Sequence, residues 1–528
     1  MRPMVDNLQA ALSDSQTVVF RTDSSRSIGY GHVMRCLTLA MALKQQGCQC
    51  YFICRDLLNN HSALVEQHGF VLVLLPRDTY LSPENDTSEP RHCSLLETSW
   101  QHDISQCVSH FNVIKPDIIV VDHYALDEKW ETQAKAYCKK LMVIDDLADR
   151  MHRCDILLDY NLSVKSNAYK TWVPQKCQLL LGGKYVLLRD EFKQWQYLSI
   201  QRRISKRLET ILVTFGGIDS DNNSEKVLQV IKDTPLLALK RIDVVVSANA
   251  PHLSSLQSAA QAMQIETHIH TNVNNMAELM AVADLAIGSG GGCTYERLFM
   301  KLPSLLMPIA DNQVTPLLSM SQLGLFELFL NFNELSIKLG RYCSHPLPLV
   351  AAPVLFGAPL VCQNLLAKEV TLADVKPLDI RRTFHWLQDV TLRGQFVQTK
   401  APVKASHFIY WRALLKDQTQ YTFSILQQGR HVGNLGIKHL NVQRSEAELW
   451  IYIGVQTEQN KGLGTIALTL LENIIKHTLL INNIVIHVAK DNSPALSFYN
   501  KLGYVICDDK LIAAEFSEKN VLQMRKVL

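Results

Sequence analysis

Short apolar runs, each ending in a polar or glycine-rich turn, alternate with helical patterns over the first two thirds of this 528-residue chain. The first unit is TVVFR, then a loop that contains Gly29 and Gly31, and then a helical pattern with Val33, Leu37 and Ala40 on one face. Near-continuous apolar strands interleaved with helices are typical of a parallel sheet that helices cover on both faces. The pattern therefore predicts a doubly wound α/β fold.

A polar, basic stretch at residues 193–210 interrupts this pattern, which restarts with ILVTFGGIDSDNN. From about Val370 the runs become typical of antiparallel strands around one long helix. We therefore expect two Rossmann-like domains followed by an α+β domain, at residues 17–200, 205–345 and 370–528. Residues 331–368 are rich in proline, and we expect them to form the end of the second domain and a linker.

Composition narrows the possible partners. The formal net charge is +3, which gives no reason to expect nucleic acid as a partner. The thirteen cysteines form no C-x-x-C pair, so we expect buried, reduced thiols rather than a metal site. The first residues lack the apolar core of a signal peptide, and the most apolar later stretch is broken by four prolines. We expect a cytoplasmic protein with no membrane partner and no metal.

His32 follows Gly29 and Gly31 directly, at the point where a strand's loop becomes a helix. A helix N-terminus offers free N–H groups and a partial positive charge, which suit a diphosphate or a developing anion. The same charge favours a neutral imidazole, so His32 is a candidate general base. Arg35 lies one turn further on the same helix face and can hold phosphate or a carboxylate. The alternative is that His32 only satisfies a loop carbonyl.

Other polar residues end strands at the same predicted edge. Asp122 and Tyr124 follow the strand IIVV, and Asp145 and Asp146 end the next strand. In doubly wound folds such strand ends line the ligand crevice, although any one of them can instead cap a turn.

The second α/β half contains two glycine-rich turns, FGGIDSDN and GSGGGCTYE, each after an apolar strand. Neither continues into the Gly-Lys-Ser/Thr of a Walker loop. Backbone amides in such turns can surround a nucleotide diphosphate, and Glu296 in the following helix can bind a ribose diol. Both loops can alternatively be tight turns of the sheet.

These segments, together with VVDHYALDEKWE, IDDLADRMHRCDILLDYN, GGKYVLLRDEF and MPIADNQ, resemble the UDP-sugar hydrolases of pseudaminic acid biosynthesis, over about residues 18–313. The resemblance implies a GT-B-like pair of domains and inverting water attack on UDP-2,4-diacetamido-2,4,6-trideoxy-β-L-altropyranose. It implies that His32 is catalytic. The substrate- and UDP-binding residues that we expect are Gly29, Gly31, Arg35, Asp122, Tyr124, Gly216, Gly217, Ser289, Gly290, Gly291, Glu296 and Asn312. Tyr295 stands where the family often has tryptophan.

The last third has a second loop signature, QNKGLGT, between a strand and a helix, which aims backbone N–H groups at a pyrophosphate. With AKDNSPALSFYNKLGY it resembles the GNAT superfamily of N-acetyltransferases over about residues 370–527. The resemblance implies acetyl-CoA as co-substrate and Tyr499 as the general acid that protonates the thiolate. The implied acetyl-CoA-binding residues are Gln459, Gly462, Gly464, Thr465 and Asn492.

Two points remain open within this part of the chain. Without the loop, Tyr499 would be an ordinary tyrosine of an amphipathic helix. Glu446 and Glu448 are weak candidates for deprotonating the acceptor amine, because surface carboxylates are common on an antiparallel strand.

Together the two resemblances predict a bifunctional nucleotide-sugar enzyme that N-acetylates the 4-amino UDP-sugar and then releases UDP. It would act on small molecules, a UDP-sugar and acetyl-CoA. One alternative is a UDP-sugar glycosyltransferase with a non-catalytic acetyl-CoA-binding regulatory domain. Another is acetylation of a protein N-terminus.

Overall fold

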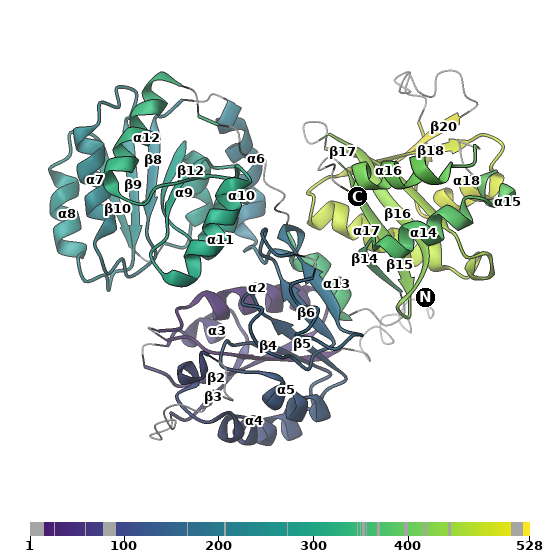
Figure 1. Ribbon diagram of the computed structural model, residues 1–528, viewed down its shortest axis with the longest axis horizontal. Coiled ribbons are helices and arrows are strands. Elements are labelled where there is room, and N and C mark those ends of the chain that lie inside the picture. The colour runs from purple at the N-terminus through teal and green to yellow at the C-terminus, as the bar shows by residue number, and fades with distance from the viewer. Residues whose placement is uncertain are drawn as a thin grey trace, which may run out of the picture. The chain divides into compact units, whose positions relative to one another are not determined.

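The computed structural model describes residues 15–528 with several gaps. The gaps are residues 26, 59, 78–90, 166, 205–206, 272, 346, 349, 351–353, 355, 367–369, 395–399, 416, 418–419, 442–444 and 508–520, together with the side chains of 311, 312, 343, 344 and 441. The chain forms two compact units, Met1–Ala358 and Pro359–Leu528. Figure 1 shows two separate α/β sheets in the first unit and a third sheet in the second.

The first sheet has the strand order β3-β2-β1-β4-β5-β6-β7, and all of its pairs are parallel. Its strands are β1 (Thr17–Thr22), β2 (Gln49–Arg55), β3 (Val71–Leu75), β4 (Ile118–Asp122), β5 (Lys140–Ile144), β6 (Ile156–Asp159) and β7 (Gln178–Leu181). Its helices are α2 (Gly31–Gln45), α3 (Ala63–Gln67), η1 (Cys93–Leu96), α4 (Trp100–Ile114), α5 (Glu128–Ala134), η2 (Lys135–Tyr137) and η3 (Gly183–Tyr185).

Helices cover both faces of this sheet, as its apolar strands require. On one face Val19 and Ile119 pack with Phe111 of α4 and with Trp130 of α5, and these residues are buried. In Figure 1, α2 lies along the opposite face from α4 and α5. Burial on both faces explains why the strands read as continuous apolar runs rather than as alternating ones.

The second sheet has the strand order β10-β9-β8-β11-β12-β13, again with parallel pairs only. Its strands are β8 (Thr210–Thr214), β9 (Arg241–Val246), β10 (Glu266–Thr271), β11 (Leu285–Ser289), β12 (Ser304–Met307) and β13 (Glu327–Leu328). Its helices are α6 (Glu191–Ile204), α7 (Asn223–Asp233), α8 (Leu253–Gln261), α9 (Met276–Val282), α10 (Gly292–Phe299), α11 (Asp311–Gln322) and α12 (Phe332–Ser344).

The sequence-based description of residues 331–368 as a domain end and linker was incomplete, because this range contains two helices. In α12 the residues Leu335 and Leu339 are fully buried and belong to the core of the second sheet. They stand four residues apart, so they share one helix face that the sheet covers. The second helix is α13 (Ala358–Leu366). The prolines between these two helices made the helical spacing of their apolar residues hard to recognise in the sequence.

The second unit contains a mixed sheet of order β14-β15-β16-β17-β18-β20-β19. Its strands are β14 (Val370–Asp374), β15 (Tyr421–Gln427), β16 (Arg430–Asn441), β17 (Glu446–Ile453), β18 (Asn483–Ala489), β19 (Val505–Ile506) and β20 (Val521–Val527). Its helices are α14 (Pro377–Trp386), α15 (Val390–Arg393), α16 (Lys404–Leu414), η4 (Gln456–Glu458), α17 (Leu463–His477) and α18 (Ser493–Lys501). Among the described strands of this sheet, only β17 and β18 pair in parallel.

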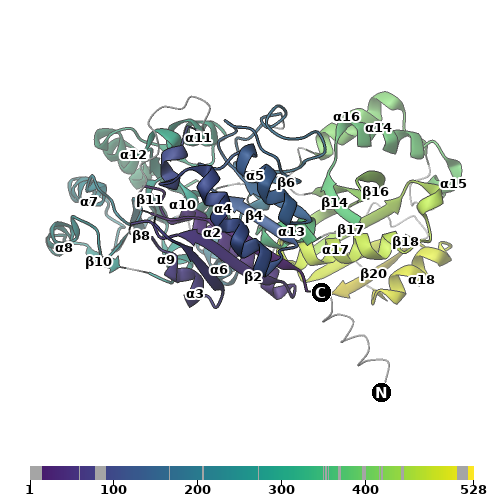
Figure 2. The same cartoon turned by 90° about the horizontal axis from the view of Figure 1, so that it is seen from below.

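The two faces of this sheet carry different side chains. Figure 2 shows α17 on one side of the sheet and α14 with α16 on the other. Trp450 of β17 packs against Ile380 of α14 and Trp411 of α16.

These arrangements confirm the predicted fold class, with two doubly wound α/β sheets before an α+β domain. Within the described part of the chain no helix is long and apolar enough to span a membrane.

Candidate functional sites

The first candidate site lies where the strand order of the first sheet reverses. Strand β1 stands between β2 and β4, and the chain leaves it on one side and returns on the other. Thr22 and Asp122 are register partners at the carboxyl ends of β1 and β4. Ligands of open α/β sheets bind at this kind of switch point, because the loops on either side part there.

The loop after β1 places His32 in the first turn of α2. Gly29 adopts a φ of +78°, a conformation that L side chains rarely take, and its N–H donates to the Ser25 carbonyl at 2.8 Å. This tight closure starts α2 beside β4. The Nδ1 atom of His32 lies 2.6 Å from Oδ1 of Asp122. Both side chains are buried, although that of His32 remains 7% exposed.

Arg35 holds the same carboxylate from one helical turn further on. Its Nε donates to Oδ2 of Asp122 and its Nη2 donates to Oδ1, each at 2.6 Å. Its Nη1 donates to Asp146 at 3.2 Å and to the Tyr160 hydroxyl at 3.3 Å. A two-pronged guanidinium–carboxylate contact fixes orientation as well as charge. Arg35 therefore holds the carboxylate of Asp122, and its expected part in binding substrate or UDP stays a prediction.

The surroundings of Asp122 and Tyr124 determine whether each of these side chains is charged. Burial alone would raise the pKa of Asp122, but Arg35 and then His32 outweigh burial and lower that pKa well below its usual range. Asp122 is therefore an anion, and it accepts the Nδ1 proton of His32. Burial raises the pKa of Tyr124, whose ring lies 4.5 Å from the His32 ring, so this phenol stays protonated.

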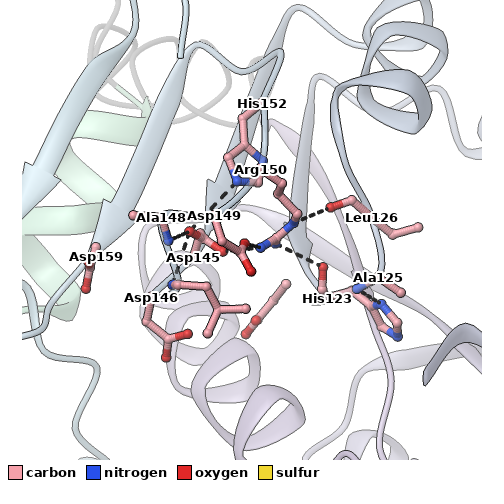
Figure 3. A network of polar contacts seen from close by, with 12 residues as sticks. His123, Ala125, Leu126, Asp145, Asp146, Ala148, Asp149, Arg150, His152 and Asp159 are labelled. Carbon is pink, nitrogen blue, oxygen red and sulfur yellow. Dashed lines mark hydrogen bonds and ion pairs between the residues drawn. The ribbon is translucent and has the colours of Figure 1, made fainter. Parts of the chain in front are cut away.

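A second polar network, formed by Asp145, Ala148 and Arg150, holds the loop after β5 next to this site. Figure 3 shows Asp145 turned toward His152, whereas Asp146 points away from it. Asp145 pairs with Arg150 at 2.7 Å and accepts from the Ala148 N–H at 2.9 Å. These contacts fix the loop after β5, which leaves Asp146, 24% exposed, beside Arg35.

Both glycine-rich turns of the second sheet also lie at a switch point, between β8 and β11. Gly216 has a φ of +88° just after β8, and Gly217 follows it. Ser289 ends β11, and Gly291 has a φ of +119° as the N-cap of α10.

Gly290, just before α10, packs closely against Leu317 of α11. A Cβ added to Gly290 would lie 2.7 Å from a methyl carbon of Leu317, so no larger residue fits there without movement. The N-terminus of α10 therefore presents bare backbone amides, which can surround a diphosphate. Asn312 belongs to α11, but its side chain lies outside the described residues.

Glu296 already has a cationic partner that the sequence did not reveal. Its Oε1 accepts from Nη2 of Arg189 at 3.1 Å, and Arg189 also contacts Glu191 at 2.7 Å. Its Oε2 is buried and has no hydrogen-bond partner among the described residues. Glu296 can therefore accept further hydrogen bonds, such as those of a diol, through Oε2.

Two residues at the end of β6, missed from sequence, connect the two sheets of this unit. The Tyr295 hydroxyl of α10 donates to Oδ1 of Asn161 at 2.6 Å. The Tyr295 ring meets the Tyr160 ring edge-on at 5.2 Å, and Arg35 lies 5.8 Å from the Tyr160 ring centre. A continuous chain of contacts thus runs from the helix of the glycine loop to Arg35. The sequence did contain a signal for both residues, because Tyr160 and Asn161 end the segment CDILLDYN at the predicted edge of the sheet.

No group of three or more His, Cys, Asp and Glu side chains could hold a metal ion within the described ranges. The expectation of a metal-free site stays a prediction.

The second unit has its own loop-to-helix site. Gly462, with a φ of +80°, is the N-cap of α17, and Gly464 and Thr465 lie in the first turn. Gln459 donates to the Ile453 carbonyl at 2.9 Å, which anchors the loop to the end of β17. The N-terminus of α17 follows this anchored loop, and a helix N-terminus of this kind can bind an anion.

Tyr499 and Asn492 lie on the next helix, α18. Tyr499 is 8% exposed, and burial raises the pKa of its phenol, which therefore remains protonated. Asn492 is the N-cap of α18 and accepts from the Ala495 N–H at 3.1 Å. This contact gives Asn492 a structural role, and its expected place near acetyl-CoA stays a prediction.

Comparison with known proteins gives each part of the chain a relative. Residues 369–505 match the model of the acetyltransferase (GNAT) domain. A UDP-2,4-diacetamido-2,4,6-trideoxy-beta-L-altropyranose hydrolase of Campylobacter jejuni is 28% identical over 292 residues, which are 54% of this chain and 88% of that protein. An uncharacterized protein of Methanocaldococcus jannaschii is 21% identical over 92% of this chain and 95% of its own length.

Among solved structures, MurG of Acinetobacter baumannii aligns with 67% of this chain and 99% of its own, at 12% identity and a TM-score of 0.45. A spermidine N-acetyltransferase of Vibrio cholerae in complex with CoA and spermine aligns with 30% of this chain and 95% of its own, at 18% identity and a TM-score of 0.27. From the sequence matches, the chain is a fusion of a segment related to the C. jejuni hydrolase with an acetyltransferase (GNAT) domain.

Proposed function

We propose that this chain is a bifunctional nucleotide-sugar enzyme that acetylates a 4-amino UDP-sugar and then hydrolyses the diacetamido product to UDP and free sugar. The observation that carries the hydrolase half is the contact of His32 with Asp122 at the switch point of the first sheet. The matches to the hydrolase and to the GNAT domain support the pairing of the two reactions. The domain ranges 17–200, 205–345 and 370–528 belong to this proposal.

In the hydrolytic step, a water molecule attacks the anomeric carbon while the bond from that carbon to the UDP oxygen breaks. Asp122 accepts the Nδ1 proton of His32, so the Nε2 lone pair takes the proton of the water. UDP leaves as a stable anion and needs no strong acid. Backbone amides at Gly290 and Gly291, before α10, stabilise the departing diphosphate, and Glu296 holds the ribose.

The sugar lies in this proposal against the polar side chains around His32. The Tyr124 phenol, which burial keeps protonated, forms a side-chain hydrogen bond with Asp146 and can give up this bond to donate to an acceptor on the sugar. Asp146 accepts from an N–H or O–H of the sugar, since its carboxylate is partly exposed and points out of the supporting network. Two groups of opposite hydrogen-bonding character suit a sugar that carries acetamido groups.

In the acetylation step, the amine nitrogen of the sugar attacks the thioester carbonyl of acetyl-CoA. The pyrophosphate of acetyl-CoA binds at the N-terminus of α17, on the amides near Gly462, Gly464 and Thr465. The nitrogen–carbon bond forms, the carbon–sulfur bond breaks, and Tyr499 gives its proton to the thiolate. The raised pKa of Tyr499 keeps that proton available.

The test is to incubate the whole chain with the 4-amino UDP-sugar and acetyl-CoA in water labelled with heavy oxygen, and to identify the products by NMR and mass spectrometry. We expect CoA, UDP and the free diacetamido sugar, with the label in the sugar. Label in UDP would contradict attack at carbon. Transfer of the sugar to another acceptor in preference to water would identify a glycosyltransferase instead.

A further inference from the structure

The acetyltransferase unit contains an opening in its sheet that ends at one carboxylate. Strands β17 and β18 pair in parallel only from Glu446↔Asn483 to Glu448↔Val485. Beyond that point β17 continues to Ile453 without pairing to β18. An extended chain can therefore lie between the two strands beyond Glu448. Glu448 stands at the inner end of this opening.

The opening has a suitable length for the arm of acetyl-CoA. Gln459 anchors the glycine loop to Ile453, so a pyrophosphate on the N-terminus of α17 lies near the outer end of the opening. The five steps along β17 from Ile453 back to Glu448 span about 17 Å at the usual strand rise. The long pantetheine arm, laid along β17, carries its acetyl group toward Glu448.

The sequence-based expectation that Glu448 is a surface carboxylate was wrong, because the residue is only 8% exposed. Its Oε1 lies 2.9 Å from Nδ1 of His487 and 3.0 Å from Nζ of Lys438. Its Oε2 lies 2.9 Å from Nδ1 of His439. One carboxylate thus holds two imidazoles and an ammonium group.

Both oxygens of Glu448 already have cationic or imidazole partners, Oε1 in His487 and Lys438 and Oε2 in His439, so the carboxylate is not placed to take a proton from an amine. Burial by itself would raise its pKa, but His487 and Lys438 outweigh burial and lower the pKa to about 2. The carboxylate is therefore an anion at every physiological pH. A fixed anion beside an imidazole orients its ring and stabilises the imidazolium that forms after proton transfer.

Of the two imidazoles, His439 is the accessible one. Its side chain is 56% exposed, whereas that of His487 is 8% exposed. His439 lies where the register between β16 and β17 shifts, and its φ is +52°, in the left-handed region that favours glycine. Bulges re-aim side chains near active sites, and a strained conformation of this kind persists only where its surroundings hold it.

We propose that His439 is the general base of the acetyltransferase, and that Glu448 is the positioning residue that orients it. The inference rests on the proposed acetylation of an amino sugar. The acceptor ammonium gives one proton to Nε2 of His439, and its nitrogen then attacks the thioester carbonyl. After the carbon–sulfur bond breaks, Tyr499 protonates the thiolate, and the second nitrogen proton passes through water to the Tyr499 phenolate that remains. His439 returns its proton to water, which its exposure permits.

Within the described part of the chain, further charged groups lie on the strands beside this pair. Lys438 and His487 face Glu448 from β16 and β18, and the neighbouring Glu446 is held by Arg525 of β20 at 2.7 Å. Lys438 competes for the same carboxylate as His439, so it limits how strongly Glu448 attracts the acceptor. It leaves Oε2 to His439.

The decisive test compares His439→Gln with wild type in acetylation of the 4-amino UDP-sugar across pH. Removal of a general base typically lowers the rate by 10²-fold or more. We expect that loss in kcat near neutral pH, with little change in KM for acetyl-CoA. The loss should shrink as the pH rises above the pKa of the acceptor amine, because the amine then needs no base to lose its first proton.

His477→Gln is the matched control, since His477 is an exposed histidine at the far end of α17, and we expect it to leave acetylation unchanged. Glu448→Gln should also lower kcat without loss of acetyl-CoA binding in calorimetry. Wild-type rates for His439→Gln, or a loss that is equal at all pH values, would overturn the base assignment alone. A wild-type chain that binds acetyl-CoA but leaves the amino sugar unacetylated would overturn the proposed function and this inference with it.

Discussion

Nδ1 of His32 lies 2.6 Å from Oδ1 of Asp122, and the two residues come from different elements of the first sheet. His32 begins α2, and Asp122 ends β4. Arg35 donates hydrogen bonds to both oxygens of the same carboxylate, and these bonds keep the Asp122 carboxylate oriented toward the imidazole. A histidine that only satisfied a loop carbonyl would not need this arrangement. His32 therefore does more than satisfy a loop carbonyl, and its catalytic role stays a prediction.

Removal of either partner should slow hydrolysis. His32→Gln leaves a polar group without a useful base, and we expect the rate of UDP release to fall by about 10²-fold or more. Asp122→Asn should also slow it, because an amide does not stabilise an imidazolium. Steady-state release of UDP from the diacetamido sugar measures both effects. Acetyl transfer by both variants should stay near the wild-type rate, and unimpaired hydrolysis by His32→Gln would assign His32 a structural role.

Glu296 and Arg189 should contribute to nucleotide affinity together. Glu296→Gln removes a charge-assisted hydrogen bond to the ribose, worth about 1.5–3 kcal/mol, and leaves Glu191 as the charged partner of Arg189. We expect UDP to bind about tenfold more weakly or worse in calorimetry. Glu334→Gln changes a partly exposed glutamate at the start of α12 and serves as the control. Equal affinities for UDP in the two variants would remove Glu296 from the binding site.

Much of the fold could be predicted because each sheet leaves a simple periodic signal. Strands buried on both faces, such as IIVV, read as apolar runs, and glycine turns mark their ends. Helix α12 also left a periodic signal, since Phe332 and Tyr342 pack on the same core as Leu335 and Leu339, but the prolines that follow it favoured the interpretation as a linker. Its burial depends on the second sheet, which the local sequence does not reveal.

The site was only partly predictable, because sequence identifies strand ends but not the contacts between them. His32, Arg35 and Asp122 were expected at one edge, and the structure brings them into direct contact. Their pairing joins residues about ninety positions apart, which no local pattern encodes. Arg189 was missed for the same reason, as its partner Glu296 lies on another sheet's helix. Whether these residues act on substrate stays a prediction.

Tyr295→Phe should uncouple the nucleotide helix from the catalytic face. The substitution removes the hydroxyl that donates to Asn161 at 2.6 Å but keeps the ring beside Tyr160. If the hydroxyl positions Tyr160, and through it Arg35, kcat for hydrolysis should fall severalfold while UDP affinity stays the same. Tyr197→Phe, on an exposed tyrosine of α6, is the control. A pure rise in KM would show instead that Tyr295 contributes to substrate binding.

Tyr499→Phe tests the order of the two reactions. The variant loses the proposed proton donor but keeps the ring contacts with Phe498 and Tyr504. Acetyl transfer should fall about 10²-fold or more while acetyl-CoA still binds. UDP release from sugar supplied already diacetylated should be unchanged, and release starting from the 4-amino precursor should become slow. Rapid UDP release from the unacetylated precursor would contradict the proposed sequence of steps.

The buried pair of His152 and Glu131 should make stability depend on pH. Burial alone would lower the pKa of His152, but Glu131, whose Oε1 lies 2.7 Å from Nδ1, and Asp145 outweigh it and raise the pKa to about 9. A histidine whose pKa is raised by folding stabilises the folded state fully below the unfolded value of about 6.5, and this contribution is lost as the pH rises through about 9. The shift corresponds to about 3 kcal/mol. His152→Gln should therefore lower the unfolding temperature most near pH 6 and least above about pH 9, measured by calorimetry on the transition that the substitution shifts. A difference from wild type that is constant across this range would mean that His152 contributes by packing alone.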